Sequence, residues 1–317
     1  MSEIRVTVQL PGIGEFLKKH FPVTLVPIEQ FREADYFVGD TCTHHIDAFK
    51  GVRVLYTAEN HHVDLNRFDY CLTHDYVEND RCHRLPYWHY VTLDNSADRE
   101  YLMGNRPKVT PEQLVETQPE FCSFVCRNPK GKERNALVRA LMKVRRVNCA
   151  GPFMNNTGSL LPYGEKQNYQ RRHCFSMAYE NESYPGYQTE KIIDAFVSGS
   201  IPIYWGNTLV AKEFNPAAFV NAHDFRRRED LVDYLVKLAD DPVRRAEMIN
   251  CNILQDPDVF TKCDKELVDF FSRIFERGPG AIQRTPFQRF MGVLQQFYGH
   301  GLFRTIRYTS RRLRGKW

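Results

Sequence analysis

The segment from residue 179 to residue 191 combines residue types that can bind an anion. An aromatic residue, Tyr187, precedes Thr189, Glu190 and Lys191, which stand at the expected start of a helix. Backbone N–H groups at a helix start, together with a lysine, can hold a diphosphate. A lysine is unfavourable in a first helical turn unless a negative charge lies nearby. The pattern also fits an ordinary strand–loop–helix connection, in which Thr189 is the N-cap and Glu190 complements the helix dipole.

A second candidate cation, Arg134, opens another expected helix after the loop 128–132. A guanidinium group can bind a phosphate through two parallel hydrogen bonds. The spacing alone favours the alternative, in which Arg134 is a solvated charge near Glu133. The loop is not a P-loop, because Lys132 is followed by Glu133 and the pattern G-x-x-x-x-G-K-[ST] is absent.

Short apolar runs alternate with helical patterns along the chain and predict an α/β fold. Strands are expected at 4–10, 24–28, 34–40, 53–60 and 68–74, and a second series begins near Glu120 and ends with a strand at 218–225. We therefore predict two halves, each built on a parallel sheet, that face a cleft. Ligands of such folds bind outside the carboxyl ends of the strands, where both candidate cations are expected.

Four stretches of the second half follow one another along the chain. They are NPKGKERNAL (128–137), YENESYPGYQTEKIIDAF (179–196), IPIYWG (201–206) and FNPAAFVNAHDF (214–225). In this order they resemble the donor domain of the family 10 glycosyltransferases, the alpha-1,3/1,4-fucosyltransferases, in their soluble bacterial form. YTAEN followed by FDY extends the similarity into the first half, which otherwise matches more loosely. The resemblance implies the GT-B architecture of two Rossmann-like domains, with GDP-fucose as the donor.

The resemblance also implies three domain assignments. Residues 1–118 would bind the acceptor, residues 119–280 would bind GDP-fucose, and residues 281–317 would form a C-terminal helix and a basic tail. The polar, weakly patterned stretch 90–118 is expected to be the linker.

Carried over to this sequence, the resemblance assigns roles to single residues. Arg134 and Lys191 would hold the GDP diphosphate, and Glu190 would meet the fucose as a second catalytic residue. Tyr187 and Asn181 would line the nucleotide site. Glu59 of YTAEN would be the general base.

The two residues that follow Glu59-Asn60 depart from the residues that bacterial relatives often have there. They are His61 and His62, which we expect to bind the acceptor. The departure leaves the choice of acceptor open.

The implied reaction is an inverting transfer of L-fucose to a hydroxyl of a GlcNAc-containing glycan, in alpha-1,3 or alpha-1,4 linkage. N-acetyllactosamine and a lipopolysaccharide side chain are the acceptors that the resemblance suggests. Two alternatives remain: a GT-B enzyme that uses another nucleotide sugar, and a non-catalytic glycan-binding protein. No cofactor is required, although a divalent ion could assist.

Several histidines and cysteines of the first half raise the question of a metal site, since both residue types bind zinc. None of them shows paired ligand spacing, so we expect no metal centre and interpret the histidines as surface or acceptor-binding residues. The residues concerned are Cys42, His44, His45, His61, His62, His74, Cys82 and His83.

The charge of the chain is concentrated at one end. The formal net charge is +4, yet from Arg277 onward the sequence has basic residues and no acidic one. This argues against a nucleic-acid-binding protein, which needs a basic face on its folded domain. No apolar run approaches the ~20 residues of a membrane span. The nine scattered cysteines are expected to be reduced thiols, so we expect a cytoplasmic protein. We further hypothesise that the basic, amphipathic tail contacts an anionic inner-membrane face.

Overall fold

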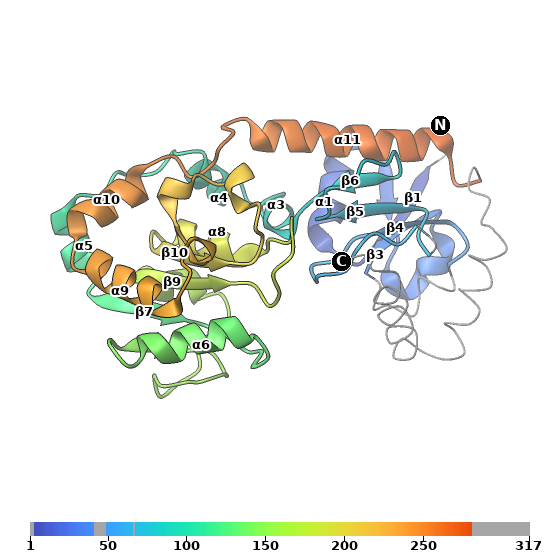
Figure 1. Ribbon diagram of the computed structural model, residues 1–317. Coiled ribbons are helices and arrows are strands. Elements are labelled where there is room, and N and C mark those ends of the chain that lie inside the picture. Colours follow the sequence, from blue (N-terminus) through green and yellow to red (C-terminus); the bar gives the residue numbers. More distant parts are fainter. Residues whose placement is uncertain (1–2, 41–48, 66, 281–317) are drawn as a thin grey trace. The chain divides into compact units, whose positions relative to one another are not determined.

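The computed structural model describes residues 3–40, 49–65 and 67–280 (Figure 1). The chain divides into two compact units: one runs up to Leu85 and resumes at Lys262, and the other spans Pro86–Thr261. Cys42, His44, His45, the predicted tail helix and its predicted membrane contact lie outside the described residues. None of the helices in the described ranges combines the length and the hydropathy that crossing a bilayer requires.

The first unit is built on a six-stranded sheet in which every pair of neighbours is parallel. Its two central strands, β3 (Tyr36–Gly39) and β4 (Val52–Leu55), are buried along their whole length, as expected for parallel strands that are covered on both faces. The strand order is β2 (Val23–Leu25), β1 (Ile4–Val8), β3 (Tyr36–Gly39), β4 (Val52–Leu55), β5 (Tyr70–Thr73) and β6 (Cys82–Arg84).

Two long helices belong to this sheet. Helix α1 (Pro11–His20) follows β1 and buries Ile13, Phe16 and Leu17. Helix α11 (Val259–Arg277) packs aromatic residues on the strands, because Phe270 meets Tyr70 edge to face and Phe275 meets Tyr36 in the same way. The chain between β2 and β3 forms a 3₁₀ helix, Ile28–Glu33.

The second unit contains a five-stranded parallel sheet with β9 (His173–Tyr179) at its centre. All seven residues of β9 are buried. The order is β11 (Val220–Asn221), β10 (Ile201–Trp205), β9 (His173–Tyr179), β7 (Glu120–Phe124) and β8 (Val147–Cys149). Its helices include α6 (Lys132–Leu141), α7 (Lys166–Gln170), α8 (Glu190–Val197), α9 (Arg228–Ala239) and α10 (Pro242–Asn250).

The stretch expected to be a linker, 90–118, holds two short helices instead, and a third short helix ends at its first residue. These are α3 (Tyr87–Tyr90), α4 (Ser96–Leu102) and α5 (Pro111–Thr117). The side chain of Asn95 caps α4, and Thr110 begins α5 with a capping box. The Asn250 side chain bonds both the N–H and the C=O of Val109, which fastens this stretch to α10.

The compact units therefore differ in extent from the predicted domains. Their first boundary lies after Leu85 rather than at residue 118, because α3 and α4 pack on α8 and α5 packs on α10. The chain from Lys262 onward returns to the first unit, because α11 covers that unit's sheet. The acceptor and donor roles of the two halves stay predictions.

Two strand predictions also need correction. Strand β6 was not expected, because Cys82–Arg84 lies in a polar stretch. The expected strand at 218–225 is only the two residues of β11, because 3₁₀ turns precede and follow it.

Candidate active site

A fully buried carboxylate, Glu180, lies directly after β9 and organises the start of α8. Its Oε1 accepts a hydrogen bond from the backbone N–H of Thr189 at 2.7 Å, and its Oε2 lies 2.8 Å from the Thr189 hydroxyl. Gly206, which follows β10, makes room for it, because a Cβ there would lie 2.5 Å from the Glu180 Cγ. Figure 1 shows β9, β10 and α8 beside one another.

Lys191 is the cation of this cluster. Its Nζ donates to Glu180 Oε2 at 3.0 Å and to the Thr189 hydroxyl at 2.7 Å, and lies 3.6 Å from Glu190 Oε1. Burial alone would lower the pKa of Lys191, but the carboxylates of Glu180 and Glu190 outweigh burial and raise this pKa above its usual range. The lysine is therefore charged, and the negative charge expected near it is supplied first by Glu180.

The Thr189 side chain does not have the capping role considered from the sequence. Thr189 is the N-cap residue of α8, but its side chain makes no cap hydrogen bond to that helix and contacts Glu180 instead. The N–H groups at a helix start have no partner within the helix. Helix α8 therefore begins next to the Lys191 ammonium without a side-chain cap, as an anion-binding helix start would.

Arg134 lies in the first turn of α6 and is only 3% exposed. Its Nη1 donates to Asn181 Oδ1 at 3.0 Å, and its Nη2 donates to the carbonyl of Asn128. Its Nε is buried and makes no hydrogen bond to any residue in the described ranges. Because leaving a buried charged donor unsatisfied is costly, this guanidinium is suited to an anionic ligand.

Tyr187 belongs to the same loop and is buried. The preceding Gly186 has a φ of 92°, which glycine adopts without strain, and its N–H donates to Asn207 Oδ1 at 2.7 Å. The Tyr187 N–H donates to the carbonyl of Tyr184 at 3.1 Å, which closes a turn in the loop before α8. The second unit thus brings together, around one loop, the five residues that the resemblance assigned to the donor: Arg134, Asn181, Tyr187, Glu190 and Lys191.

Glu59, His61 and His62 lie in the first unit, in the loop that follows β4. Glu59 is exposed, and its backbone N–H donates to the Thr57 hydroxyl at 3.1 Å. His61 Nδ1 lies 3.7 Å from Asp40 Oδ1, and His62 Nδ1 lies 3.0 Å from Asp75 Oδ1. Their catalytic and acceptor-binding roles stay predictions.

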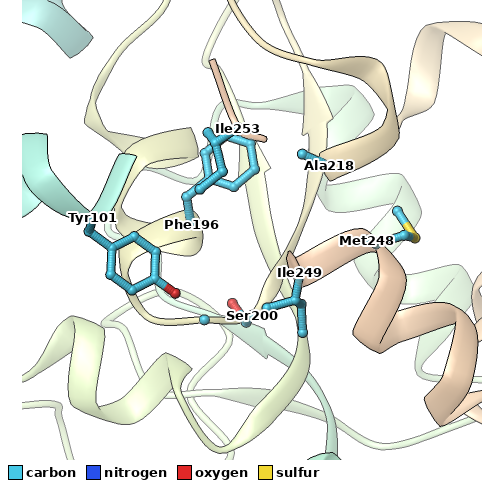
Figure 2. Close-up of a pocket in the computed structure, with 8 residues that line it drawn as sticks. Tyr101, Phe196, Ser200, Ala218, Met248, Ile249 and Ile253 are labelled. Atoms are coloured by element: carbon cyan, nitrogen blue, oxygen red, sulfur yellow. The ribbon is translucent and has the colours of Figure 1, made fainter. Parts of the chain in front are cut away.

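A small cavity elsewhere in the second unit is not a substrate site. Figure 2 shows Tyr101, Phe196 and Ile253 among the side chains that line it. Its volume of about 10 Å³ admits one water molecule and no sugar nucleotide.

Residues 115–248 match the sequence model of glycosyltransferase family 10 (fucosyltransferase), C-terminal part. Over these residues the chain is similar to the family 10 fucosyltransferases. An alpha-(1,3)-fucosyltransferase of Helicobacter pylori is 35% identical over a match that covers 58% of this chain and 43% of that protein. An alpha-(1,4)-fucosyltransferase of Arabidopsis thaliana is 30% identical over 36% of this chain and 33% of that protein. The matches thus span less than half the length of these curated relatives.

The fold comparison extends further along the chain than the curated sequence matches. The structure of an alpha1,3-fucosyltransferase with GDP-fucose is 28% identical and superposes with a TM-score of 0.72, covering 86% of this chain and 90% of that chain. A structure of HepE from Anabaena with UDP and glucose shares the fold at 9% identity, with a TM-score of 0.52. The predicted GT-B fold class is confirmed.

The contacts by which Glu180 and Thr189 position Lys191, and the space that Gly206 leaves for Glu180, were not predicted from the sequence. A signal was present, because an acidic residue ending an apolar strand must find a cation or several donors if it is buried. Lys191 lies eleven positions further on and supplies that cation.

Proposed function

We propose that the protein is an inverting fucosyltransferase, which moves L-fucose from GDP-fucose to a hydroxyl of a GlcNAc-containing glycan in alpha-1,3 or alpha-1,4 linkage. The observation that carries this proposal is the cluster of Arg134, Asn181, Tyr187, Glu190 and Lys191 at the carboxyl end of β9 and at the starts of α6 and α8. The similarity to an alpha1,3-fucosyltransferase solved with GDP-fucose supports this donor.

The two cations would act on the leaving group. Breaking the bond between the fucose C1 and the phosphate oxygen leaves an electron pair and a growing negative charge on GDP. Lys191 has three N–H donors, of which Glu180 and Thr189 take two, so the third can reach a phosphate oxygen. The buried Nε of Arg134 offers a further donor. Positive charge that is held in place before the reaction stabilises such a transition state.

Glu190 is suited to binding the sugar rather than the phosphate. Burial alone would raise its pKa, but Lys191 and Lys166 outweigh burial and lower this pKa, so the carboxylate is ionised. An ionised carboxylate accepts hydrogen bonds from sugar hydroxyls. Its side chain is 36% exposed, which leaves it accessible to a ligand. Tyr187 and Asn181 would line the nucleotide next to it.

Glu59 would be the general base. It would take the proton of the acceptor hydroxyl while the acceptor oxygen attacks C1 from the face opposite GDP, and this attack inverts the anomeric configuration. Glu59 is exposed at the carboxyl edge of the first sheet, where a glycan can reach it. His61 and His62, in the same loop, would contact the acceptor.

The donor assignment is tested with the whole chain and a panel of nucleotide sugars. We expect GDP and GDP-fucose to raise the melting temperature, because a ligand that binds only the folded state stabilises it. We expect transfer to N-acetyllactosamine from GDP-fucose and not from GDP-mannose or UDP-glucose. Equal transfer from another GDP-sugar would support a different glycosyltransferase, and no response to GDP would support a non-catalytic glycan-binding protein.

Gly131 gives a test of Arg134 that changes no charge. A Cβ at Gly131 would lie 2.8 Å from the Cζ of Arg134, so Gly131→Ala should push the guanidinium aside. The backbone there has a φ of −71°, which alanine adopts freely, so we expect the fold to keep its stability. GDP affinity, measured by calorimetry, should fall several-fold. Gly280→Ala is the control, since a Cβ there meets nothing within 4 Å; equal affinity in both variants would remove Arg134 from the phosphate site.

A further inference from the structure

Three potential metal ligands converge at the carboxyl edge of the first sheet. His74 and Asp75 come directly after β5, and His62 lies in the loop that follows the neighbouring strand β4. One nitrogen of each histidine and one oxygen of Asp75 all lie within 4.8 Å of one another. The cluster joins residues that are thirteen positions apart in the sequence, which explains why the local ligand spacing did not reveal it.

The two distances from Asp75 to the histidines are close to those between ligands of a small divalent ion. Asp75 Oδ1 lies 3.0 Å from His62 Nδ1 and 3.6 Å from His74 Nε2. Zinc bonds of 2.0–2.1 Å in tetrahedral geometry place neighbouring ligand atoms about 3.3 Å apart. An ion could therefore bind with displacements of a few tenths of an ångström in these two distances.

Other contacts hold the carboxylate in place. Asp75 Oδ2 accepts the backbone N–H of Val63 at 3.1 Å, and the Asp75 N–H donates to the Thr73 hydroxyl at 3.0 Å. These bonds leave Oδ1 facing the two histidines. Hydrogen bonds of this kind orient metal ligands and strengthen metal binding. His74 is 4% exposed and its ring packs 5.7 Å from that of His62, so little rearrangement is open to it.

The alternative is an ordinary hydrogen bond between His62 and Asp75. That pair would need only one histidine, whereas here the nitrogens of two histidines lie near the same carboxylate oxygen. Two imidazoles and one carboxylate are also the ligand set of many zinc sites, with a fourth position left for water or another ligand.

We propose that His62, His74 and Asp75 bind one divalent transition-metal ion of the zinc class. The ion would fasten the loop after β4 to the end of β5. Glu59 lies three residues before His62 in that loop, so the ion would also restrict the movement of the carboxylate. This last consequence rests on the proposed role of Glu59, whereas metal binding itself does not. The proposal departs from the expectation, drawn from spacing, that the chain has no metal site.

The test uses the full chain after treatment with EDTA and removal of the chelator. Titration with Zn²⁺ in a calorimeter should give one ion per chain, and Co²⁺ should give the visible absorption of a four-coordinate site. His62→Ala and His74→Ala should each lower the Zn²⁺ affinity by more than the about 10–100-fold that loss of a supporting hydrogen bond costs. His20→Ala is the matched control, because His20 is an exposed histidine on α1 of the same unit.

Three outcomes would overturn the proposal: no Zn²⁺ binding at one ion per chain, no four-coordinate cobalt spectrum, or equal affinity in His62→Ala and the unaltered chain. His62 is partly exposed, so His62→Ala keeps the test decisive if the more buried His74 variant fails to fold. Zn²⁺ binding without fucose transfer would contradict the proposed function and leave the metal site standing.

Discussion

Replacing Glu59 by glutamine is expected to lower the rate of fucose transfer by about 10²–10⁴-fold, the usual contribution of a general base. Glutamine keeps the size of the side chain and its hydrogen-bonding capacity but cannot take the acceptor proton. GDP affinity should be unchanged, because the residues proposed to bind GDP belong to the second unit. The measurements are kcat for transfer to N-acetyllactosamine and GDP binding by calorimetry.

Glu78→Gln is the matched control for this variant. Glu78 is also an exposed glutamate of the first unit, and its replacement should leave both measurements unchanged. Full turnover by Glu59→Gln would remove Glu59 from the catalytic role, and another carboxylate would have to be sought.

Replacing Lys191 by alanine should weaken GDP binding by about 10- to 100-fold, because a hydrogen bond to a charged group contributes about 1.5–3 kcal/mol. The variant loses its contact with the phosphate. It also no longer neutralises the negative charge that develops on the leaving group, so kcat should fall as well. GDP affinity is measured by calorimetry. Lys237→Ala, which removes an exposed lysine from α9 of the same unit, should bind GDP normally.

The buried carboxylate of Glu180 complicates this variant, because removing one partner of a buried ion pair commonly costs 3–5 kcal/mol of stability. The double variant Glu180→Gln with Lys191→Ala removes both charges and should restore much of the lost stability. It should still bind GDP weakly. Normal GDP affinity in the folded double variant would reject the phosphate role of Lys191.

The sequence predicted most of the donor half because its signals are local there. Three successive elements lie within 25 consecutive residues: the apolar run of β9, the loop with Gly186 and the helix that begins at Glu190. Each consists of residue types that strongly prefer the structure observed there. Strand β4 was predicted for the same reason, but it ends at Leu55 and not at residue 60, so Glu59 lies in the loop that follows it.

Features that depend on distant contacts were not predicted. Helices α4 and α5 are polar and short, and their places are set by contacts with α8 and α10 rather than by their own pattern. The contact between Arg134 and Asn181 joins residues 47 positions apart, and sequence spacing alone favoured a solvated arginine. The cluster of His62, His74 and Asp75 likewise forms only because β4 and β5 are neighbours in the sheet.

The most direct test of the central claim is the anomeric configuration of the product. The whole chain is incubated with GDP-fucose and N-acetyllactosamine, and the fucose anomeric proton is followed by nuclear magnetic resonance as GDP is released. We predict alpha-linked fucose on the glycan, in amounts equal to the GDP formed, with inversion of the beta configuration of the donor. Beta-linked fucose, or release of GDP with no fucose on any GlcNAc-containing glycan, would contradict it.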